Sequence, residues 1–394
     1  DFNIDFLRSG NYICHMFVFS RNIYEKIGGF RAEYNGSQDH DFILRACEAA
    51  EHIHHIPKVL YHWRMTANST SANPESKMYC YEAGRNAVAA HLERLGIDAD
   101  VSLGINYGTY VTKYKVRGEP LISIIIPNKD HVDDLKKCMD SIDQKSDYRN
   151  YEYIIIENNS ENEETFDFYK SLSDRENVKV IYWDDKFNYS KINNFGVKEA
   201  KGEYLLLLNN DVTMINPDAI SDMLGVCQRE EVGIVGARLY YEDGTIQHAG
   251  TIIGLGGIAG HAFQSLNEDD GSVYFGRSRL SADYSAVTAA CLMTKRSVFE
   301  QVGGLEPGFQ VAFNDVDFCL RVRQKGYLVV YDANARFYHF ESKSRGYEDT
   351  PEKQERFNRE ISLFEKRWYD ILKDGDPYYN PNFDRRLPGF ELGE

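Results

Sequence analysis

A short apolar run that ends in three polar residues constrains this chain more than any other feature. Tyr204–Leu208 is continuously apolar, too short to cross a membrane, and typical of a strand buried on both faces of a sheet. Asn209, Asn210 and Asp211 follow directly. In an open α/β sheet, ligands bind beyond the carboxyl ends of the strands, so we expect Asp211 beside a hard cation and a phosphate. The alternative is a plain turn, because Asn and Asp are common turn residues.

Strands and helices alternate in the stretch that leads up to this run. We expect strands at 121–126, 153–156 and 178–183, and helices at 131–144, 163–173 and 189–200. Such alternation forms a parallel sheet with right-handed crossovers, and the polar strand ends then meet on one rim. This stretch contains neither GxGxxG nor GxxxxGKS, which argues against a dinucleotide dehydrogenase and a P-loop enzyme.

Composition narrows the class of protein further. The chain of 394 residues has room for two or more domains, and 42% hydrophobic residues can build real cores. A formal charge of −16 argues against a nucleic-acid partner, which needs a basic face. Seven cysteines without a CxxC pair fit a reduced, cytosolic protein. There is no signal peptide and no apolar run of about 18 residues, so we expect no membrane span. The chain starts at Asp1 rather than at a methionine, and we expect it to be part of something longer.

The pattern loosens after Pro217. A Gly-rich stretch at 250–260 has His248 and His261 on its flanks. Further helices are expected at 220–227, 297–302, 315–325 and 351–372, and further strands at 232–241 and 327–331. From Gly375 the tail is rich in Pro, Tyr and Asn, and we expect a surface strap or a disordered end.

Two stretches of the chain match each other. Each contains a Gly pair, an Asp-x-Asp and a later Tyr-His, and the first Asp and the His are 23 residues apart in one copy and 24 in the other. The first copy comprises Phe19-Ser20-Arg21, Ile27-Gly28-Gly29-Phe30, Asp39-His40-Asp41-Phe42-Ile43-Leu44-Arg45 and Tyr61-His62. The second comprises Met293-Thr294-Lys295-Arg296, Val302-Gly303-Gly304-Leu305, Asp315-Val316-Asp317-Phe318-Cys319-Leu320-Arg321 and Tyr338-His339. The period is too long for a solenoid, so two copies of one domain type fit better.

The first copy lacks counterparts of the nucleotide-side strands. Within it we expect strands at Ile13–Ser20 and Ile53–Tyr61, helices at 20–27, 39–51 and 77–95, and short strands with a linker up to 118. Residues 1–118 are then the acceptor-side, C-terminal half of a truncated domain, without activity of their own. Residues 119–375 form a complete domain, and 376–394 form a tail.

The second copy places acidic residues at the start of a helix. Asp315 lies at the entry, where a carboxylate can face a cleft and act as a general base toward a sugar hydroxyl. Asp317 is expected mainly to complement the helix dipole, which is also the structural alternative for the whole motif. His339 ends a strand among aromatic residues. A single His is often only a satisfied polar group, but its recurrence as His62 argues for a function.

In this order, the motifs resemble the inverting family-two glycosyltransferases of the GT-A fold, in particular bacterial rhamnosyltransferase-like and polysaccharide-assembly members. The resemblance covers 119–372 as a whole domain and 10–66 as the C-terminal half of a second one. The matching motifs are Ser123-Ile124-Ile125-Ile126-Pro127, Ile154-Ile155-Ile156-Glu157-Asn158-Asn159-Ser160, Asn193-Asn194-Phe195-Gly196, Lys201-Gly202-Glu203, Asn209-Asn210-Asp211, Asn314-Asp315 and His339.

The resemblance implies an α/β GT-A fold, with a Rossmann-like mixed sheet flanked by helices. It implies sugar transfer, with inversion, from a UDP- or dTDP-sugar to a hydroxyl of a growing glycan or lipid-linked glycan in cell-surface polysaccharide biosynthesis. Asp315 would be the base, and Asp211 and His339 would hold Mg²⁺ or Mn²⁺. The implied donor-binding residues are Pro127, Asn128, Glu157, Asn158, Asn194, Asn209 and Asn210. The resemblance also implies that the protein acts in the cytoplasm, including as a peripheral protein at the inner face of the membrane.

Some positions depart from the family pattern. Asn209 and Asn314 stand where the family has acids, and Glu157-Asn158 replaces an Asp pair, so the site has lost carboxylates. The main alternative is therefore a catalytically degenerate domain that binds or scaffolds a glycan-assembly complex. A glycoside hydrolase is a second alternative, but it needs a carboxylate pair across the scissile bond. Asp315 and Asp317 are too close on one helix start for that.

Overall fold

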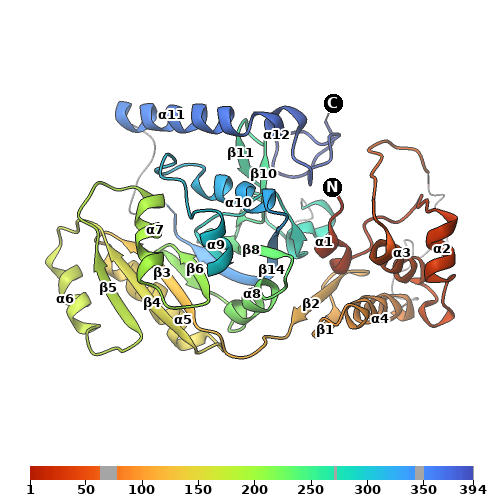
Figure 1. Cartoon of the computed structure of the whole chain (residues 1–394), viewed down its shortest axis with the longest axis horizontal. Coiled ribbons are helices and arrows are strands. Elements are labelled where there is room, and N and C mark those ends of the chain that lie inside the picture. Colours follow the sequence, from red (N-terminus) through yellow and green to blue (C-terminus); the bar gives the residue numbers. More distant parts are fainter. Residues whose placement is uncertain (63–77, 270–272, 342–349, 394) are drawn as a thin grey trace. The chain divides into compact units, whose positions relative to one another are not determined.

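The computed structural model describes residues 1–62, 78–269, 273–341 and 350–393 (Figure 1). Within them the chain divides into two compact units. Unit 1 contains Asp1–Lys115 and the short segment Arg279–Asp283. Unit 2 contains Val116–Ser278 and Tyr284–Glu394. Among the helices of these described ranges, none combines the length and apolar character that crossing a bilayer requires.

Unit 2 is built on a mixed sheet whose strands follow the order β14-β8-β13-β6-β3-β4-β5. Their bounds are β3 Ile122–Asn128, β4 Tyr151–Glu157, β5 Val178–Tyr182, β6 Tyr204–Leu208, β8 Val232–Tyr240, β13 Cys291–Lys295 and β14 Leu328–His339. Strands β6, β3, β4 and β5 are mutually parallel, as the alternating pattern predicts. Strand β13 runs antiparallel to both of its neighbours, β6 and β8. The carboxyl ends of β3, β4 and β6 therefore share one edge.

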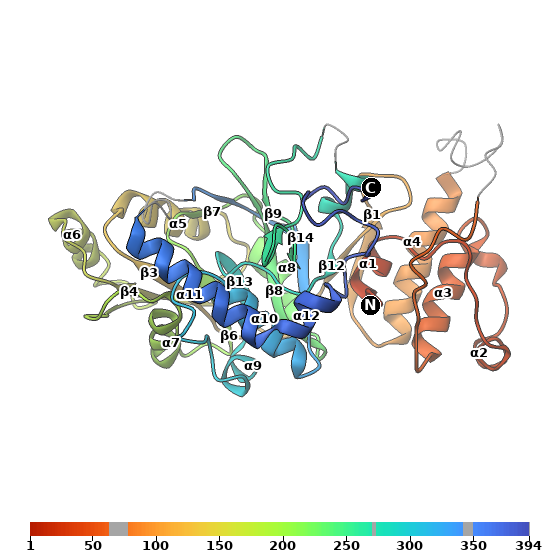
Figure 2. The same ribbon diagram turned by 90° about the horizontal axis from the view of Figure 1, so that it is seen from above.

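Helices cover both faces of this sheet. The helices of unit 2 are α5 Val132–Lys145, α6 Glu163–Ser171, α7 Tyr189–Glu199, α8 Ala219–Cys227, α9 Arg296–Gln301, α10 Asn314–Gln324, α11 Pro351–Arg367 and α12 Tyr369–Asp374, with a 3-10 helix, η3, at Tyr274–Arg279. Figure 2 shows α5 on one side of the sheet and α7 and α9 on the other. The single helix expected at 351–372 is two helices, because Trp368 has a non-helical backbone (φ −115°, ψ 28°) between them.

Small residues allow the sheet and its helices to approach closely. All five residues of β6 are buried, as expected for a strand covered on both faces. A Cβ atom at Gly202, just before β6, would lie 2.6 Å from the backbone nitrogen of Ser123 on β3. Only glycine fits this position, so the Lys201-Gly202-Glu203 lead-in brings β6 beside β3.

Short strands lie at the edge of the sheet where the parallel strands end, which we call the carboxyl-end rim. Strand β7 (Val212–Met214) pairs with the end of β14, and β9 (Ile246–His248) pairs with β8. The Gly-rich stretch forms a separate hairpin of β10 (Thr251–Ile253) and β11 (Ala259–His261). Its turn contains Gly256 and Gly257 at φ values of 65° and 118°, a backbone region that favours glycine.

The tail is an ordered part of unit 2. Asp376 is buried and accepts hydrogen bonds from the Ile253 amide (2.7 Å) and the Ser285 hydroxyl (2.8 Å). The ring of Phe390 is also buried and stacks on Phe263 with centroids 4.6 Å apart. Of the two expectations for this segment, a strap therefore fits its described residues and a disordered end does not.

Unit 1 has a smaller core. Its elements are α1 Ile4–Ser9, α2 Arg21–Ile27, the 3-10 helix η1 Ala32–Tyr34, α3 Gln38–Ala49, α4 Met78–Arg94, the antiparallel pair β1 Ala99–Leu103 and β2 Tyr110–Tyr114, and β12 Ala282–Asp283. The expected helices are thus present. Helices α3 and α4 are joined by Glu48, which accepts hydrogen bonds from His91 (2.6 Å) and Arg94 (2.6 Å).

Two strands expected in unit 1 are wrong. Residues 13–20 and 53–61 have no strand structure. The physical reason is that a strand needs a neighbour to satisfy its backbone groups. In unit 2, β13 lies between β6 and β8, and β14 lies beside β8. The described part of unit 1 holds no counterpart of β6 or β8.

Candidate active site

Asp211 and His339 meet at the edge where the parallel strands end. Asp211 follows β6, and His339 is the last residue of β14, paired in register with Val212 of β7. This pairing brings His339 Nε2 to 3.3 Å from Asp211 Oδ1. Both side chains are buried. The sheet topology therefore joins two residues that are far apart in the sequence.

The polar atoms of this pair are poorly satisfied. Asp211 Oδ1 and His339 Nδ1 have no hydrogen-bond partner among the described residues. The side-chain amide nitrogen of Asn209 lies 3.2 Å from His339 Nε2. If that nitrogen donates to Nε2, the imidazole lone pair faces a carboxylate oxygen, and the two repel each other. A divalent cation relieves this repulsion, because it accepts both atoms as ligands.

The protein ligands for such a cation are few. No group of three or more His, Cys, Asp or Glu side chains able to hold a metal occurs in the described ranges. Asp211 and His339 therefore fit a cation that takes its other ligands from water and substrate phosphate, as Mg²⁺ commonly does. A self-sufficient structural metal site is not what these residues form.

Asp315 lies at the start of α10. The preceding Phe313 has a left-handed backbone (φ 61°), and its ring packs against Phe364 of α11 at 5.3 Å. Asp315 Oδ1 accepts the Val316 amide at 2.8 Å, and Oδ2 accepts the Ala289 amide at 3.0 Å. A carboxylate offers about four acceptor positions, so two remain for a substrate hydroxyl. The side chain is only partly buried, which leaves it accessible.

The loop 288–290 ties the separate parts of the site together. Its Ala289 amide donates to Asp315, and the Ala289 carbonyl accepts the Tyr189 hydroxyl at 2.9 Å. The Ala290 carbonyl accepts the Asn209 amide at 3.0 Å. One short segment therefore fixes the start of α7, the end of β6 and the start of α10.

In the sequence, His248 and His261 only flank the Gly-rich stretch. In the structure, their side chains lie together. Their Nδ1 atoms are 2.7 Å apart, and His248 Nε2 accepts the Thr288 amide at 3.4 Å. His248 therefore carries its proton on Nδ1 and donates it to His261, whose own proton is then on Nε2. Burial lowers the pKa of both imidazoles, so the pair is neutral. Its attachment to loop 288–290 places it in the same site, a proximity that no local pattern predicts.

The sequence does not single out Tyr189 either, because an aromatic residue at the start of a helix has no distinctive sequence signature. Burial, and secondarily the charge of Asp315, raises the pKa of its phenol. Tyr189 is therefore a stable hydrogen-bond donor to loop 288–290.

Three predicted donor-binding residues form one buried chain of hydrogen bonds. The Asn210 side-chain amide donates to Asn128 Oδ1 at 2.6 Å. The Asn128 amide donates to the Tyr169 hydroxyl at 2.8 Å, and that hydroxyl donates to Glu157 at 2.8 Å. The chain connects the ends of β6, β3 and β4, and the partly buried Pro127 lies beside it in β3.

The neighbouring polar side chains hold the rim loops in place. Glu157 also accepts the Ser160 hydroxyl at 2.7 Å. The Asn158 amide donates to the carbonyls of Trp183 (3.3 Å) and Asp185 (3.1 Å). These contacts direct both side chains toward protein rather than solvent.

Asn194 is not brought together with these residues. Its amide nitrogen donates to the Leu305 carbonyl at 2.8 Å, and its oxygen accepts the Leu305 amide at 2.9 Å. Asn194 thus clamps α7 to the loop after α9. Asp317 is likewise internal, since it is fully buried and accepts hydrogen bonds from Arg321, Arg367 and Trp368.

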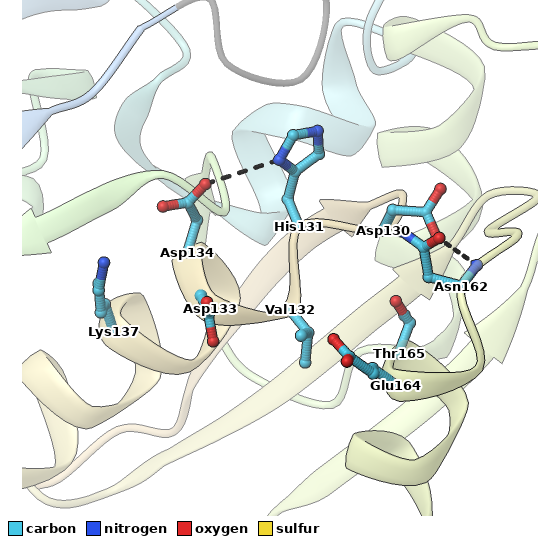
Figure 3. Close-up of a pocket in the computed structure, with 9 residues that line it drawn as sticks. All are labelled: Asp130, His131, Val132, Asp133, Asp134, Lys137, Asn162, Glu164 and Thr165. Atoms are coloured by element: carbon cyan, nitrogen blue, oxygen red, sulfur yellow. Dashed lines mark hydrogen bonds and ion pairs between the residues drawn. The ribbon is translucent and has the colours of Figure 1, made fainter.

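A cavity of about 350 Å³ adjoins this rim (Figure 3). It is lined by Asp130, His131, Val132, Asp133, Asp134, Lys137, Asn162, Glu164 and Thr165, which come from the starts of α5 and α6 and the loops before them. None of the predicted site residues lines it, but Asn128 touches it by donating to the Asp130 carbonyl at 3.0 Å. Its excess of carboxylates makes it a poor place for a phosphate.

Comparison with known proteins identifies the domain. Residues 123–303 match the sequence family described as Glycosyl transferase family 2. The solved structure of GalNAc-T7 with UDP, GalNAc and Mn²⁺ shares the fold at a TM-score of 0.52 and 13% identity, over 68% of this chain and 51% of that one. Unit 2 thus has the GT-A fold, and residues 123–303 within it resemble family 2 glycosyltransferases.

Two relatives match nearly the whole chain. The uncharacterized protein y4gI of Sinorhizobium fredii is 45% identical over 100% of this chain and 44% of its own length. The O-antigen biosynthesis protein RfbC of Myxococcus xanthus is 38% identical over 97% of this chain and 29% of its own length. The chain thus spans less than half the length of either relative.

Proposed function

We propose that residues 119–375 form a metal-dependent, inverting glycosyltransferase. It moves a hexose-type sugar, in a rhamnosyltransferase-like reaction, from a UDP- or dTDP-sugar to a hydroxyl of a growing or lipid-linked glycan. The similarity to RfbC supports a place in polysaccharide biosynthesis. We further propose that the enzyme works in the cytoplasm, including peripherally at the inner face of the membrane.

The observation that carries this proposal is Asp211 Oδ1, a buried oxygen with no hydrogen-bond partner among the described residues, 3.3 Å from His339 Nε2 at the carboxyl-end rim. A buried carboxylate oxygen without a donor is costly unless a ligand completes it. Asp315 is joined to the same site through loop 288–290. This connection supports a base and a cation-binding pair at one rim.

In the proposed reaction, Asp315 accepts the proton of the acceptor hydroxyl as its oxygen attacks the anomeric carbon. The amides of Val316 and Ala289 hold the carboxylate in place and leave its other acceptor positions for the hydroxyl. The carbon–oxygen bond to the diphosphate breaks on the opposite face, which inverts the configuration. A divalent cation held by Asp211 and His339 would stabilise the charge on the departing diphosphate.

The asparagine chain of the rim supports the donor. Asn210 and Asn128 fix each other at the ends of β6 and β3, next to Asp211. We propose that Asn209, Asn210, Asn128, Pro127 and the loop of Glu157-Asn158 together shape the nucleotide site, and that Asn194 contributes only by positioning α7.

A degenerate binding module is the second candidate. It is favoured by the two amides, Asn209 and Asn314, that replace acids, and by a cation site with only two protein ligands. Such a module would bind a nucleotide sugar or a glycan but would not turn it over.

A panel of UDP- and dTDP-sugars separates the candidates. Each sugar is titrated against the protein with and without Mn²⁺, and the binder is then incubated with lipid-linked glycan. The enzyme proposal predicts Mn²⁺-dependent binding and transfer to the glycan. Binding without transfer identifies the module, and release of free sugar without an acceptor identifies a hydrolase.

A further inference from the structure

The two repeat copies share a set of hydrogen bonds as well as a sequence. In unit 2, Arg321 Nε donates to Asp317 at 2.8 Å, and its NH1 donates to the Val302 carbonyl at 2.7 Å. In unit 1, Arg45 Nε donates to Asp41 at 3.0 Å, and its NH1 donates to the Ile27 carbonyl at 2.7 Å. Ile27 and Val302 occupy the same repeat position, directly before the Gly pair.

The aromatic packing is repeated too. Phe318 lies 5.4 Å from Phe299 of α9, and the corresponding Phe42 lies 6.2 Å from Tyr24 of α2. Helices α2 and α3 thus form the same local arrangement as α9 and α10. Agreement in a buried ion pair, a helix cap and a ring contact is hard to reconcile with chance similarity.

Corresponding apolar side chains of the two repeat copies differ greatly in how far they are exposed. Phe30 is 63% exposed, whereas its counterpart Leu305 is 1% exposed. Leu60 is 64% exposed, whereas Phe337 of β14 is fully buried. Val18 is 79% exposed, whereas Met293 of β13 is fully buried. Helix α2 contains no buried residue at all.

The buried copy shows what covers these positions. Strand β13 hydrogen-bonds β6 on one side and β8 on the other, and β14 hydrogen-bonds β8. The segments of unit 1 that correspond to β13 and β14 are 16–20 and 53–62. They carry strand-like apolar residues, but no strand of the described unit lies beside them. Exposed apolar side chains that gather on one surface mark interaction sites. The rings of Phe19 and Phe30 both lie against Phe42, with centroids 4.7 and 4.9 Å away.

We infer that segments 16–20 and 53–62, with Phe30 and the exposed side of α2, form a docking surface for a nucleotide-binding half-domain. Its occupant would be a polypeptide built like residues 119–290, with strands equivalent to β6 and β8. On docking, 16–20 would become a central strand between these two, and 53–62 would become a strand beside the second. This is strand addition, in which backbone hydrogen bonds supply affinity and alternate side chains supply specificity.

The occupant would be a segment of a longer polypeptide that contains this chain. Both relatives that match the whole chain are more than twice its length, which leaves room for such a half. A second copy of this chain cannot serve, because its β6 and β8 already have neighbours on both sides. In the completed domain, Asp39 and His62 would take the places that Asp315 and His339 hold in unit 2.

Hydrogen–deuterium exchange tests this surface. The longer polypeptide that this inference requires, with a half-domain built like residues 119–290 in addition to this sequence, is compared with the 394-residue chain. We expect the amides of 17–20 and 53–61 to exchange at least ~100-fold more slowly in the longer protein, since strand pairing protects them. Val18→Lys should remove this protection. Ile105→Lys is the matched control, because Ile105 is 75% exposed in unit 1 but lies outside the repeat.

Three results would overturn the inference. One is equally fast exchange of both segments in the longer protein. Another is protection already present in the 394-residue chain, together with a dimer mass in solution, which would make a second copy the occupant. Loss of protection in Ile105→Lys as well as in Val18→Lys would also contradict a surface defined by the repeat.

Discussion

The α2–α3 pair of unit 1 and the α9–α10 pair of unit 2 keep the same ionic and cap contacts but differ in what surrounds them. In unit 2 a sheet covers the pair, and the apolar residues of the repeat are buried. In unit 1 the same positions are exposed, and the strand segments have no strand structure. The comparison teaches that an Arg–Asp clasp and a Gly pair suffice to set two helices, whereas strand structure requires a partner.

Catalysis should show the largest contrast between the copies. Asp315→Asn should lower kcat by about 10²–10⁴-fold, because general-base catalysis is typically worth that much. Donor affinity should change less, since a base acts mainly in the transition state. The counterpart substitution Asp39→Asn should leave kcat unchanged in this chain. Steady-state kinetics at saturating donor measures both, with the melting temperature as the control for folding.

A wild-type rate for Asp315→Asn would remove Asp315 from the mechanism. If Asp317→Asn were inactive but stable in the same assay, the base would be Asp317. The three hydrogen bonds that the buried Asp317 carboxylate accepts predict instead that Asp317→Asn loses stability first.

Apolar truncation sharpens the comparison of burial. Leu305→Ala should destabilise unit 2 by about 2–5 kcal/mol, because it opens a cavity in a packed core. Phe30→Ala should change stability by less than about 0.5 kcal/mol, because its ring is mostly in solvent. Urea unfolding monitors both variants. Equal losses would mean that Phe30 has a partner in solution.

At one position of the repeat, only unit 1 should lose stability as the pH falls. His40 stands where unit 2 has Val316, and burial lowers its pKa from 6.5 to about 4. The folded state therefore keeps His40 neutral, and its contribution is complete above pH 6.5 and lost as the pH falls toward 4. From pH 7 to pH 5 we expect unit 1 to lose about 2 kcal/mol of unfolding free energy.

His40→Val should remove the part of the pH dependence of stability that is due to His40. Its unfolding free energy should vary less between pH 7 and pH 5 than that of the wild type, as measured by urea titration at both values. The pKa of His91 is lowered in the same direction by burial, so some pH dependence should remain. An unchanged slope in His40→Val would mean that His40 is solvated in solution.

The sequence predicts elements well where local pattern and tertiary context agree. Strand β6 has the bounds expected from its five apolar residues, because both of its neighbours are present. The segments 13–20 and 53–61 have equally strand-like sequences and are not strands. The apolar pattern of a segment predicts which side chains it would bury in a sheet. It does not predict whether a neighbouring strand is present to pair with it.

The candidate site follows the same rule. Asp211, Asp315 and His339 could be named from motifs, because each sits at the end or start of an element on one rim. The His248–His261 pair and Tyr189 could not, since loop 288–290 joins them only in three dimensions. Asn194 fits its motif but binds Leu305, because a polar side chain serves packing as readily as ligands.

The cation site tests the account most directly, and it too has a counterpart in unit 1. His62 matches His339, but the first copy has no residue equivalent to Asp211. Calorimetric titration of UDP- and dTDP-sugars, with and without Mn²⁺, is made on the wild type, Asp211→Ala, His339→Ala and His62→Ala. The account predicts Mn²⁺-dependent binding that disappears in Asp211→Ala, weakens by at least ~10–100-fold in His339→Ala, as loss of even an outer-shell contact does, and is unchanged in His62→Ala. Wild-type, Mn²⁺-dependent binding by a folded Asp211→Ala would contradict it.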